Sequence, residues 1–203
     1  GDFTGSEGNT GGFSDFFEQL FGGTQSRRAR NAPLRGHDYE AELQLSLRDA
    51  AETHKQVLSV GEQSVRVTIP AGVSDGQRLR LRGYGGEAPQ GGTRGDLYIT
   101  FRILPDKGFS RVGNDLHLTA TLPLTTAVLG GEVVIETLKG NVRVKVSAGT
   151  QPGSKLRLRG KGFPIYKREG SYGDLIVSFQ LSIPNAPSPQ QRKLFEELRQ
   201  TGI

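Results

Sequence analysis

The side chains best suited to catalysis or metal binding are the three histidines, and they stand far apart. His37, His54 and His117 are isolated in the sequence, and none has the spacing of a metal-ligand pair. The chain has no cysteine, so disulfides and thiolate metal sites are excluded, and a zinc site would need carboxylates instead. We therefore expect no metal and no cofactor.

Motifs for phosphate binding or nucleophilic attack are also missing. The sequence has no nucleophile elbow, no Gly-Lys-Ser/Thr phosphate loop and no His-Glu-x-x-His. The run Gly83-Tyr84-Gly85-Gly86 is loosely like a dinucleotide-binding loop, but it follows an expected strand without opening a helix. We interpret these residues as turn glycines and predict no catalytic residues, so the protein is not expected to be an enzyme.

Basic side chains recur at every second position in two segments: Arg78, Arg80 and Arg82, and Arg157, Arg159 and Lys161. Such rows usually form the solvated face of a strand. The alternative is a basic stripe that binds phosphate or an acidic peptide. No aromatic residue interleaves with these side chains, which argues against a stacking platform for single-stranded nucleic acid.

The composition indicates small β-rich modules joined by flexible segments. Of 203 residues, 34% are hydrophobic, and there are 29 Gly and 10 Pro. No stretch approaches 18 consecutive apolar residues and no signal peptide is visible, which favours a soluble cytoplasmic protein without membrane contact. Methionine is absent, so we interpret the chain as part of a longer protein.

The segment before residue 37 differs from the rest. Residues 1–23 are rich in Gly and contain five Phe, which predicts a flexible region, because ordering glycine costs the most backbone entropy. It is either a plain linker or, as we favour, a linker whose Phe side chains dock on another domain. Residues 24–36 form a basic linker with Arg27, Arg28 and Arg30.

From residue 37 the chain repeats itself. Residues 65–85 match residues 142–162 at a constant offset, with 12 of 21 positions identical, and residues 95–103 match 173–181 after an insertion. The sequence thus predicts two homologous domains at 37–107 and 108–184. Apolar residues alternate with polar ones within each, as in half-buried antiparallel strands. We expect a mostly β fold of two tandem small β-sandwiches or barrels.

A short helix is predicted at the C-terminus, over residues 188–202. Ser188 has the position of an N-cap, Pro189 follows at the first helical position, and Leu194, Phe195 and Leu198 form an apolar stripe. A helix of this length is not stable alone and must pack on something. It either docks on its own second domain or, as we favour, pairs with a second copy of the chain.

The order of these parts resembles the J-domain co-chaperones of the DnaJ/CbpA type. A Gly/Phe-rich segment precedes two β-domains that carry the Val65–Gly85 motif, Gly95-Asp96-Leu97, and Leu122-Pro123-Leu124 through Gly130-Gly131, and a terminal helix follows. No Cys-x-x-Cys repeats are present, so the likeness is to the class without the zinc-binding insertion. His37 is followed by Asp38 and not by Pro, so the J-domain is missing, and this chain alone is not expected to stimulate the ATPase of a DnaK-type partner.

The resemblance implies a co-chaperone part that dimerises, binds non-native polypeptides and, in the intact protein, delivers them to a DnaK-type chaperone during stress. Carried across by alignment, the client-binding groove lies in residues 37–107 and is lined by Ala41, Leu43, Leu58, Val60 and Ile99. The alternative is that these residues are plain core. An extended client could add to an edge strand while aliphatic side chains accept its apolar residues.

A different function remains open, because CbpA-like members of the family are known as curved-DNA binders. Arg27, Arg28 and Arg30 are then the expected phosphate contacts, with a steep loss of affinity as salt rises and an association with the nucleoid. A purely structural role for the two domains is the third hypothesis.

Overall fold

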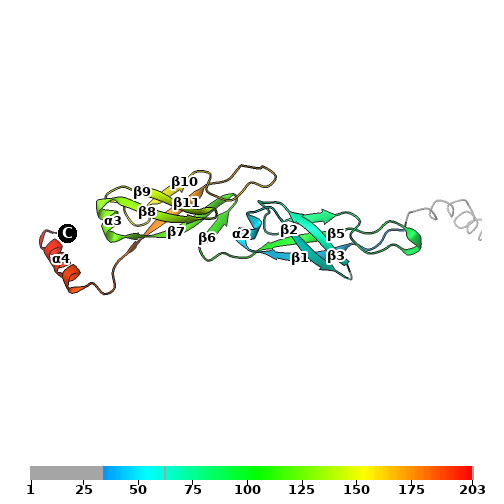
Figure 1. Cartoon of the computed structure of the whole chain (residues 1–203), viewed down its shortest axis with the longest axis horizontal. Helices are drawn as coiled ribbons and strands as arrows, with labels where there is room; N and C mark the ends of the chain where they lie inside the picture. The colour runs from blue at the N-terminus through cyan, green and yellow to red at the C-terminus, as the bar shows by residue number, and fades with distance from the viewer. Residues whose placement is uncertain (1–33, 62, 203) are drawn as a thin grey trace, which may run out of the picture. The chain divides into compact units, whose positions relative to one another are not determined.

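A computed structural model describes residues 34–61 and 63–202. The chain divides into two compact units, Gly1–Tyr39 with Leu81–Leu97 and Glu40–Arg80 with Tyr98–Ile203. The described part is mostly β, as predicted, with short helices and a helix near the C-terminus (Figure 1). The predicted Gly/Phe-rich region, 1–23, and nearly all of the predicted basic linker lie outside the described residues.

The first half of the repeat forms five strands, a short helix and a 3-10 turn. Their bounds are β1 Tyr39–Leu45, α2 Leu47–Ala50, β2 His54–Val60, β3 Gln63–Ile69, β4 Arg78–Leu81, η2 Pro89–Gly91 and β5 Leu97–Ile103. The elements that follow are β6 Phe109–Val112, β7 Asp115–Pro123, α3 Leu124–Leu129, β8 Gly131–Thr137, β9 Gly140–Val146, β10 Lys155–Leu158, β11 Leu175–Ser182 and α4 Pro189–Gln200.

The repeat in the sequence is also a repeat in the structure. Strands β2, β3 and β4 begin at His54, Gln63 and Arg78, and β8, β9 and β10 begin at Gly131, Gly140 and Lys155, so the spacing between starts is the same in both copies. Strand β11 begins one position later than β5 would predict, because the second copy has an insertion before it. Equivalent residues in the two copies can therefore be compared position by position.

Strand β1 lies beside β5 in the first copy, and its counterpart β7 lies beside β11 in the second. In the second copy, β7 and β11 are parallel, with Leu116 beside Leu175, and the sheet order is β10-β11-β7-β6. In the first copy the order is β1-β5-β4. The N–H of Tyr39 donates to the carbonyl of Asp96, and the N–H of Leu104 donates to that of Leu45, so β1 and β5 also run in the same direction.

The middle strands form separate antiparallel hairpins, β2 with β3 and β8 with β9 (Figure 1). Alternate side chains of the strands face inward and build the core, as the alternating sequence pattern predicts. The largest fully buried side chains include Ile69, Leu97, Ile99, Phe101, Leu116, Leu122, Phe163 and Leu175. Each copy therefore buries one face of its sheets and leaves the other face to solvent.

Helix α4 begins as predicted. Ser188 is the N-cap, its Oγ accepts a hydrogen bond from the N–H of Gln191 at 3.2 Å, and the Gln191 side chain accepts one from the N–H of Ser188 at 2.8 Å. Pro189 occupies the first helical position. No residue of the helix is buried. Within the described ranges, no helix has the length and hydropathy needed to span a membrane.

Candidate functional site

The most strongly repeated residues hold the fold together. In the first copy, Asp96 Oδ1 accepts a hydrogen bond from the N–H of Gly83 at 2.8 Å, and Asp96 Oδ2 accepts one from Arg35 at 2.7 Å. The N–H of Asp96 itself donates to Asp38 Oδ1 at 2.7 Å. One carboxylate therefore ties the turn after β4 to the segment that precedes β1.

The second copy uses the same arrangement. Asp174 accepts from the N–H of Gly160 at 2.8 Å and from Arg157 at 2.5 Å, and its own N–H donates to Asp115 at 2.7 Å. The hydrogen bond from Gly160 and then the one from Arg157 hold the pKa of Asp174 below its ordinary value. The Gly-Asp-Leu motif is thus explained by structure and does not mark a binding site.

The glycine of that motif is required by close packing. A Cβ on Gly95 would lie 2.1 Å from the carbonyl oxygen of His37, and a Cβ on Gly173 would lie 2.0 Å from that of Asn114. No other residue type can occupy these positions unless the backbone moves.

The expected client-groove residues fall into two groups. Ala41, Leu58 and Val60 are partly exposed, whereas Leu43 is 8% exposed and Ile99 is 0% exposed. Ile99 therefore lies in the core and offers no surface to a client in this conformation. Leu43 offers a client little surface. The apolar surface that the structure leaves accessible at the predicted groove lies mainly on β2.

The second copy provides a comparison for these positions. Leu58 and Val60 on β2 correspond to Ile135 and Thr137 on β8. Ile135 is 2% exposed and Thr137 is 3% exposed, and the Thr137 hydroxyl donates to the carbonyl of Gly140 at 2.7 Å. The inner side of β8 is therefore closed where the inner side of β2 is partly open.

The strands that carry these residues lie at sheet margins. Among the strands that the structure describes, β1 is the outer strand of its sheet and β2 pairs with β3 alone. Leu58 faces Val65 across the hairpin, and the neighbouring Val57 points to the opposite face, where it is 56% exposed. The first copy thus presents unpaired strand edges next to aliphatic side chains, as a site for an extended peptide requires.

The Arg78 row belongs to the solvated outer face of the first sheet. Arg78 pairs with Glu40 at 2.6 Å and lies 4.6 Å from the centre of the Tyr98 ring, and Arg102 pairs with Glu42 at 3.3 Å. Glu40 and Glu42 on β1 thus offset the charges of Arg78 and Arg102 across the sheet.

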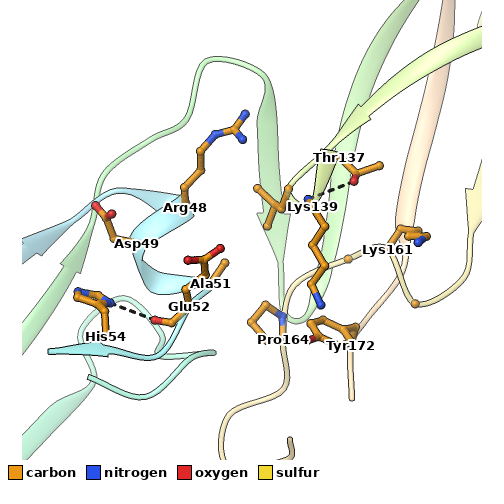
Figure 2. Close-up of a pocket in the computed structure, with 13 residues that line it drawn as sticks. Arg48, Asp49, Ala51, Glu52, His54, Thr137, Lys139, Lys161, Pro164 and Tyr172 are labelled. Carbon is orange, nitrogen blue, oxygen red and sulfur yellow. Dashed lines mark hydrogen bonds between the residues drawn. The ribbon is translucent and has the colours of Figure 1, made fainter. Parts of the chain in front are cut away.

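A cavity of about 390 Å³ lies wholly within the second compact unit (Figure 2). Most of the residues that line it are of polar or charged types, and Lys139 points toward Tyr172, with the ammonium nitrogen 3.6 Å from the ring centre. Nearby, Arg48 pairs with Glu136 at 2.6 Å. Lys139 and Arg48 thus already have partners within the protein.

An apolar groove lies beside helix α4. It encloses about 500 Å³ and is lined by Thr121, Pro123, Leu124, Thr125, Ser182, Pro184, Gln191, Leu194, Phe195 and Leu198. The three residues predicted for dimerisation are among them, and they remain 54%, 40% and 47% exposed in chain order. Contact with the second copy of the repeat therefore leaves much of the helix's apolar stripe uncovered.

Sequence reasoning missed two parts of these sites. The role of Arg35 was not predicted, because its partner Asp96 lies 61 residues away. Leu124 and Pro184 were not assigned to the groove beside α4, and no spacing pattern could have indicated them. The predicted DNA contacts Arg27, Arg28 and Arg30 lie outside the described residues.

In the part of the chain that is described, no three His, Asp or Glu side chains are grouped to hold a metal ion.

The fold and these surfaces define a class of protein: a duplicated β-module chain with apolar strand margins and a terminal amphipathic helix. The sequence model of the DnaJ C-terminal domain matches residues 39–184. The chain belongs to this DnaJ C-terminal domain family.

Relatives of known name agree with the assignment. The chain is 40% identical over 190 residues to chaperone protein DnaJ 2 of Thermus thermophilus, 33% identical over 217 residues to chaperone protein DnaJ of Deinococcus proteolyticus, and 35% identical over 205 residues to the curved DNA-binding protein of Escherichia fergusonii. These matches cover 92%, 92% and 94% of the chain. They cover 64%, 67% and 66% of the relatives, so the chain spans about two thirds of their length. None of the three has the name of an enzyme.

Proposed function

We propose that this chain binds non-native polypeptide segments at the open margin of β2 and pairs with a second copy through α4. In a longer protein of the DnaJ type it would present the bound client to a DnaK-type chaperone in the cytoplasm. The observation that carries the proposal is the partial exposure of Leu58 and Val60 on an edge strand. Their equivalents Ile135 and Thr137 are buried.

The physical basis is weak capture of extended, apolar chain. A β-turn commonly has a hydrogen bond between the carbonyl of its first residue and the N–H of its fourth, which here are Val60 and Gln63. From that pair onward, facing residues of an antiparallel hairpin alternate between pairs joined by backbone hydrogen bonds and pairs that are not. By that rule we expect Lys55, Val57 and Ser59 to direct their N–H and C=O groups to the free edge. A client strand could bond to them without a required sequence.

The proposal is tested by changing the two faces of β2 separately. Leu58→Asp places a charge on the inner side, and Val57→Asp places the same charge on the outer face at the adjacent position. We expect Leu58→Asp to abolish suppression of aggregation of a denatured model protein, and Val57→Asp to leave it nearly unchanged. Circular dichroism and the thermal midpoint check that both variants fold.

Equal suppression by a folded Leu58→Asp variant and the unmodified chain would rule out this site. Leu43→Asp is not a useful variant, because Leu43 is 8% exposed and a buried charge would damage the fold. A second measurement addresses the backbone contacts. A client peptide with N-methyl groups at alternate residues is expected to bind more weakly than the unmodified peptide, since it can donate fewer hydrogen bonds to the edge.

Dimerisation would strengthen capture. Two weak sites on one dimer raise the effective concentration of a client segment near the second site once the first has bound. The uncovered stripe of Leu194, Phe195 and Leu198 supports this part of the proposal. Since the stripe borders an apolar groove, we infer that a second copy covers helix and groove together.

DNA binding is the second candidate function. A relative that is 35% identical over 94% of this chain is named a curved DNA-binding protein, and the net charge of this chain is +5. Replacing Arg27, Arg28 and Arg30 with Gln tests the contacts expected from the sequence. Affinity for duplex DNA should then fall, and its dependence on salt should become less steep.

A further inference from the structure

The positive charge of the chain is concentrated in the second copy of the repeat. Residues 108–184 carry ten Lys and Arg against five Asp and Glu, whereas residues 37–107 carry nine against ten. Apart from β6, the described strands of the two copies follow the same order, so we compare the side chains that equivalent strands display.

The outer faces of the two main sheets show where the difference arises. On β10, Lys155 and Arg157 are exposed, and they stand beside Ser178 and Ile176 of β11. These in turn stand beside Thr119 and His117 of β7. The inward residues of the same strands, such as Leu175 and Val177, are fully buried. One face of this sheet is thus a polar surface with basic side chains along its margin.

The equivalent face of the first copy is neutralised. There, Glu40 and Glu42 on β1 pair with Arg78 and Arg102. In the alignment of the two copies, His117 takes the place of Glu40 and Thr119 takes the place of Glu42. The second copy has no acidic side chains at these two positions, but it has basic residues on β10 as the first copy has on β4.

The basic side chains on the outer face of the second copy therefore keep positive charge that no carboxylate of the described residues neutralises. Within the described ranges Lys155 has no ion pair. Arg157 pairs with Asp174 at 2.5 Å, and Arg159 lies near enough to help lower the pKa of the same carboxyl group. One carboxylate thus faces two guanidinium groups, and Lys155 adds a third positive charge on β10, the strand that carries Arg157.

We propose that the outer face of β10, β11 and β7 binds the phosphate backbone of duplex DNA. Basic side chains at alternate positions supply the charge, and the hydroxyls of Ser178 and Thr119 can donate hydrogen bonds to phosphate oxygens. No acidic side chain on β7 or β11 opposes Lys155, so the face is complementary to a polyanion. The proposal deepens the second candidate function by assigning it a surface other than Arg27, Arg28 and Arg30.

The experiment uses the whole 203-residue chain. Anisotropy of a fluorescein-labelled duplex is measured across a series of salt concentrations. The test variant is Lys155→Gln with Arg159→Gln, which keeps the pair between Arg157 and Asp174. The matched control is Arg78→Gln with Arg82→Gln, the equivalent positions of the first copy. Both variants lose two positive charges, so an effect of net charge alone would change them equally.

We expect the test variant to bind the duplex more weakly and to lower the slope of log affinity against log salt by about two units, which is roughly 0.9 for each lost phosphate contact. The control should keep the slope of the unmodified chain. Equal losses in both variants, or no loss in the test variant, would overturn the assignment.

A third variant, with Gln at positions 27, 28 and 30, separates the assigned surface from DNA binding itself. Loss of binding in that variant alone would overturn the β10 surface and leave DNA binding standing. If the unmodified chain does not bind duplex at low salt, DNA binding and the assigned surface both fail. If poly-glutamate binds at Lys155 and Arg159 and duplex does not, the partner is an acidic polypeptide and the proposal is wrong.

Discussion

Asp96 and Asp174 perform the same structural task at equivalent positions of the two copies. Each accepts a hydrogen bond at 2.8 Å from the N–H of a glycine in the turn that follows the fourth strand, Gly83 or Gly160. Asp96 is also paired with Arg35, which precedes β1, and Asp174 is paired with Arg157, which lies on β10. The duplicated motif therefore keeps its hydrogen bond to the turn glycine in both copies.

Close packing at the same motif predicts a strong effect for Gly173→Ala. The new Cβ would lie 2.0 Å from the carbonyl oxygen of Asn114, so the start of β7 must move. We expect a loss of about 3 kcal/mol in the free energy of unfolding, at the upper end of the cost of overpacking. Gly108→Ala is the control, because its Cβ would meet only Asp106 Oδ1, at 3.6 Å. Urea unfolding that gives equal midpoints for the two variants would contradict the requirement for glycine.

The stability of the fold should decrease in acid. Hydrogen bonds from the N–H groups of Gly108 and then Phe109 hold the pKa of Asp106 below its ordinary value, and the pKa values of Asp49 and Asp174 are lowered as well. At acid pH the unfolded chain therefore binds more protons than the folded chain, so stability rises with pH in this range. The contribution is complete above the ordinary carboxyl pKa and is lost as pH falls below it.

This dependence can be measured from urea midpoints at a series of pH values. We expect a constant contribution from these carboxylates down to about pH 4 and a decline below it. Asp106→Asn should flatten the decline, since the amide cannot titrate. An unchanged decline in Asp106→Asn would show that this carboxylate does not contribute.

Helix α4 gives a prediction about assembly. Leu194→Asp with Leu198→Asp should convert dimers to monomers, because two charges would have to be buried in the apolar contact. Lys193→Asp with Gln200→Asp adds two carboxylates at positions outside the apolar groove and should leave the dimer intact. Light scattering after size exclusion gives the mass of each variant. A chain that ends at Pro187 should also be monomeric, and a dimer in that case would place the contact elsewhere.

Much of the fold could be predicted from the sequence because of the duplication. The constant offset between the copies relates the positions of β8, β9 and β10 to those of β2, β3 and β4, and alternation of polar and apolar residues identifies their buried faces. The pairing of β7 with β11 could not be predicted in this way. Periodicity shows which side of a strand is buried, but not which strand lies beside it.

The candidate site was predictable only in outline. Leu58 and Ile135 have the same place in the repeat and similar hydrophobicity, so their sequence positions give no reason for one to be open and the other closed. Their exposure depends on how the β2–β3 and β8–β9 hairpins pack on the sheet beneath. Ile99 was expected at the groove, but it is a core residue with 0% exposure.

The parallel contact of β7 with β11 has a consequence for synthesis on the ribosome. Leu116 stands beside Leu175, so neighbours in this sheet are separated along the chain by most of the second copy. The sheet cannot close until its final strand has left the exit tunnel, and contacts between such distant residues form slowly. A nascent chain halted before β11 would hold β7 without that neighbour, and its apolar strand would be open to proteases and to other chaperones.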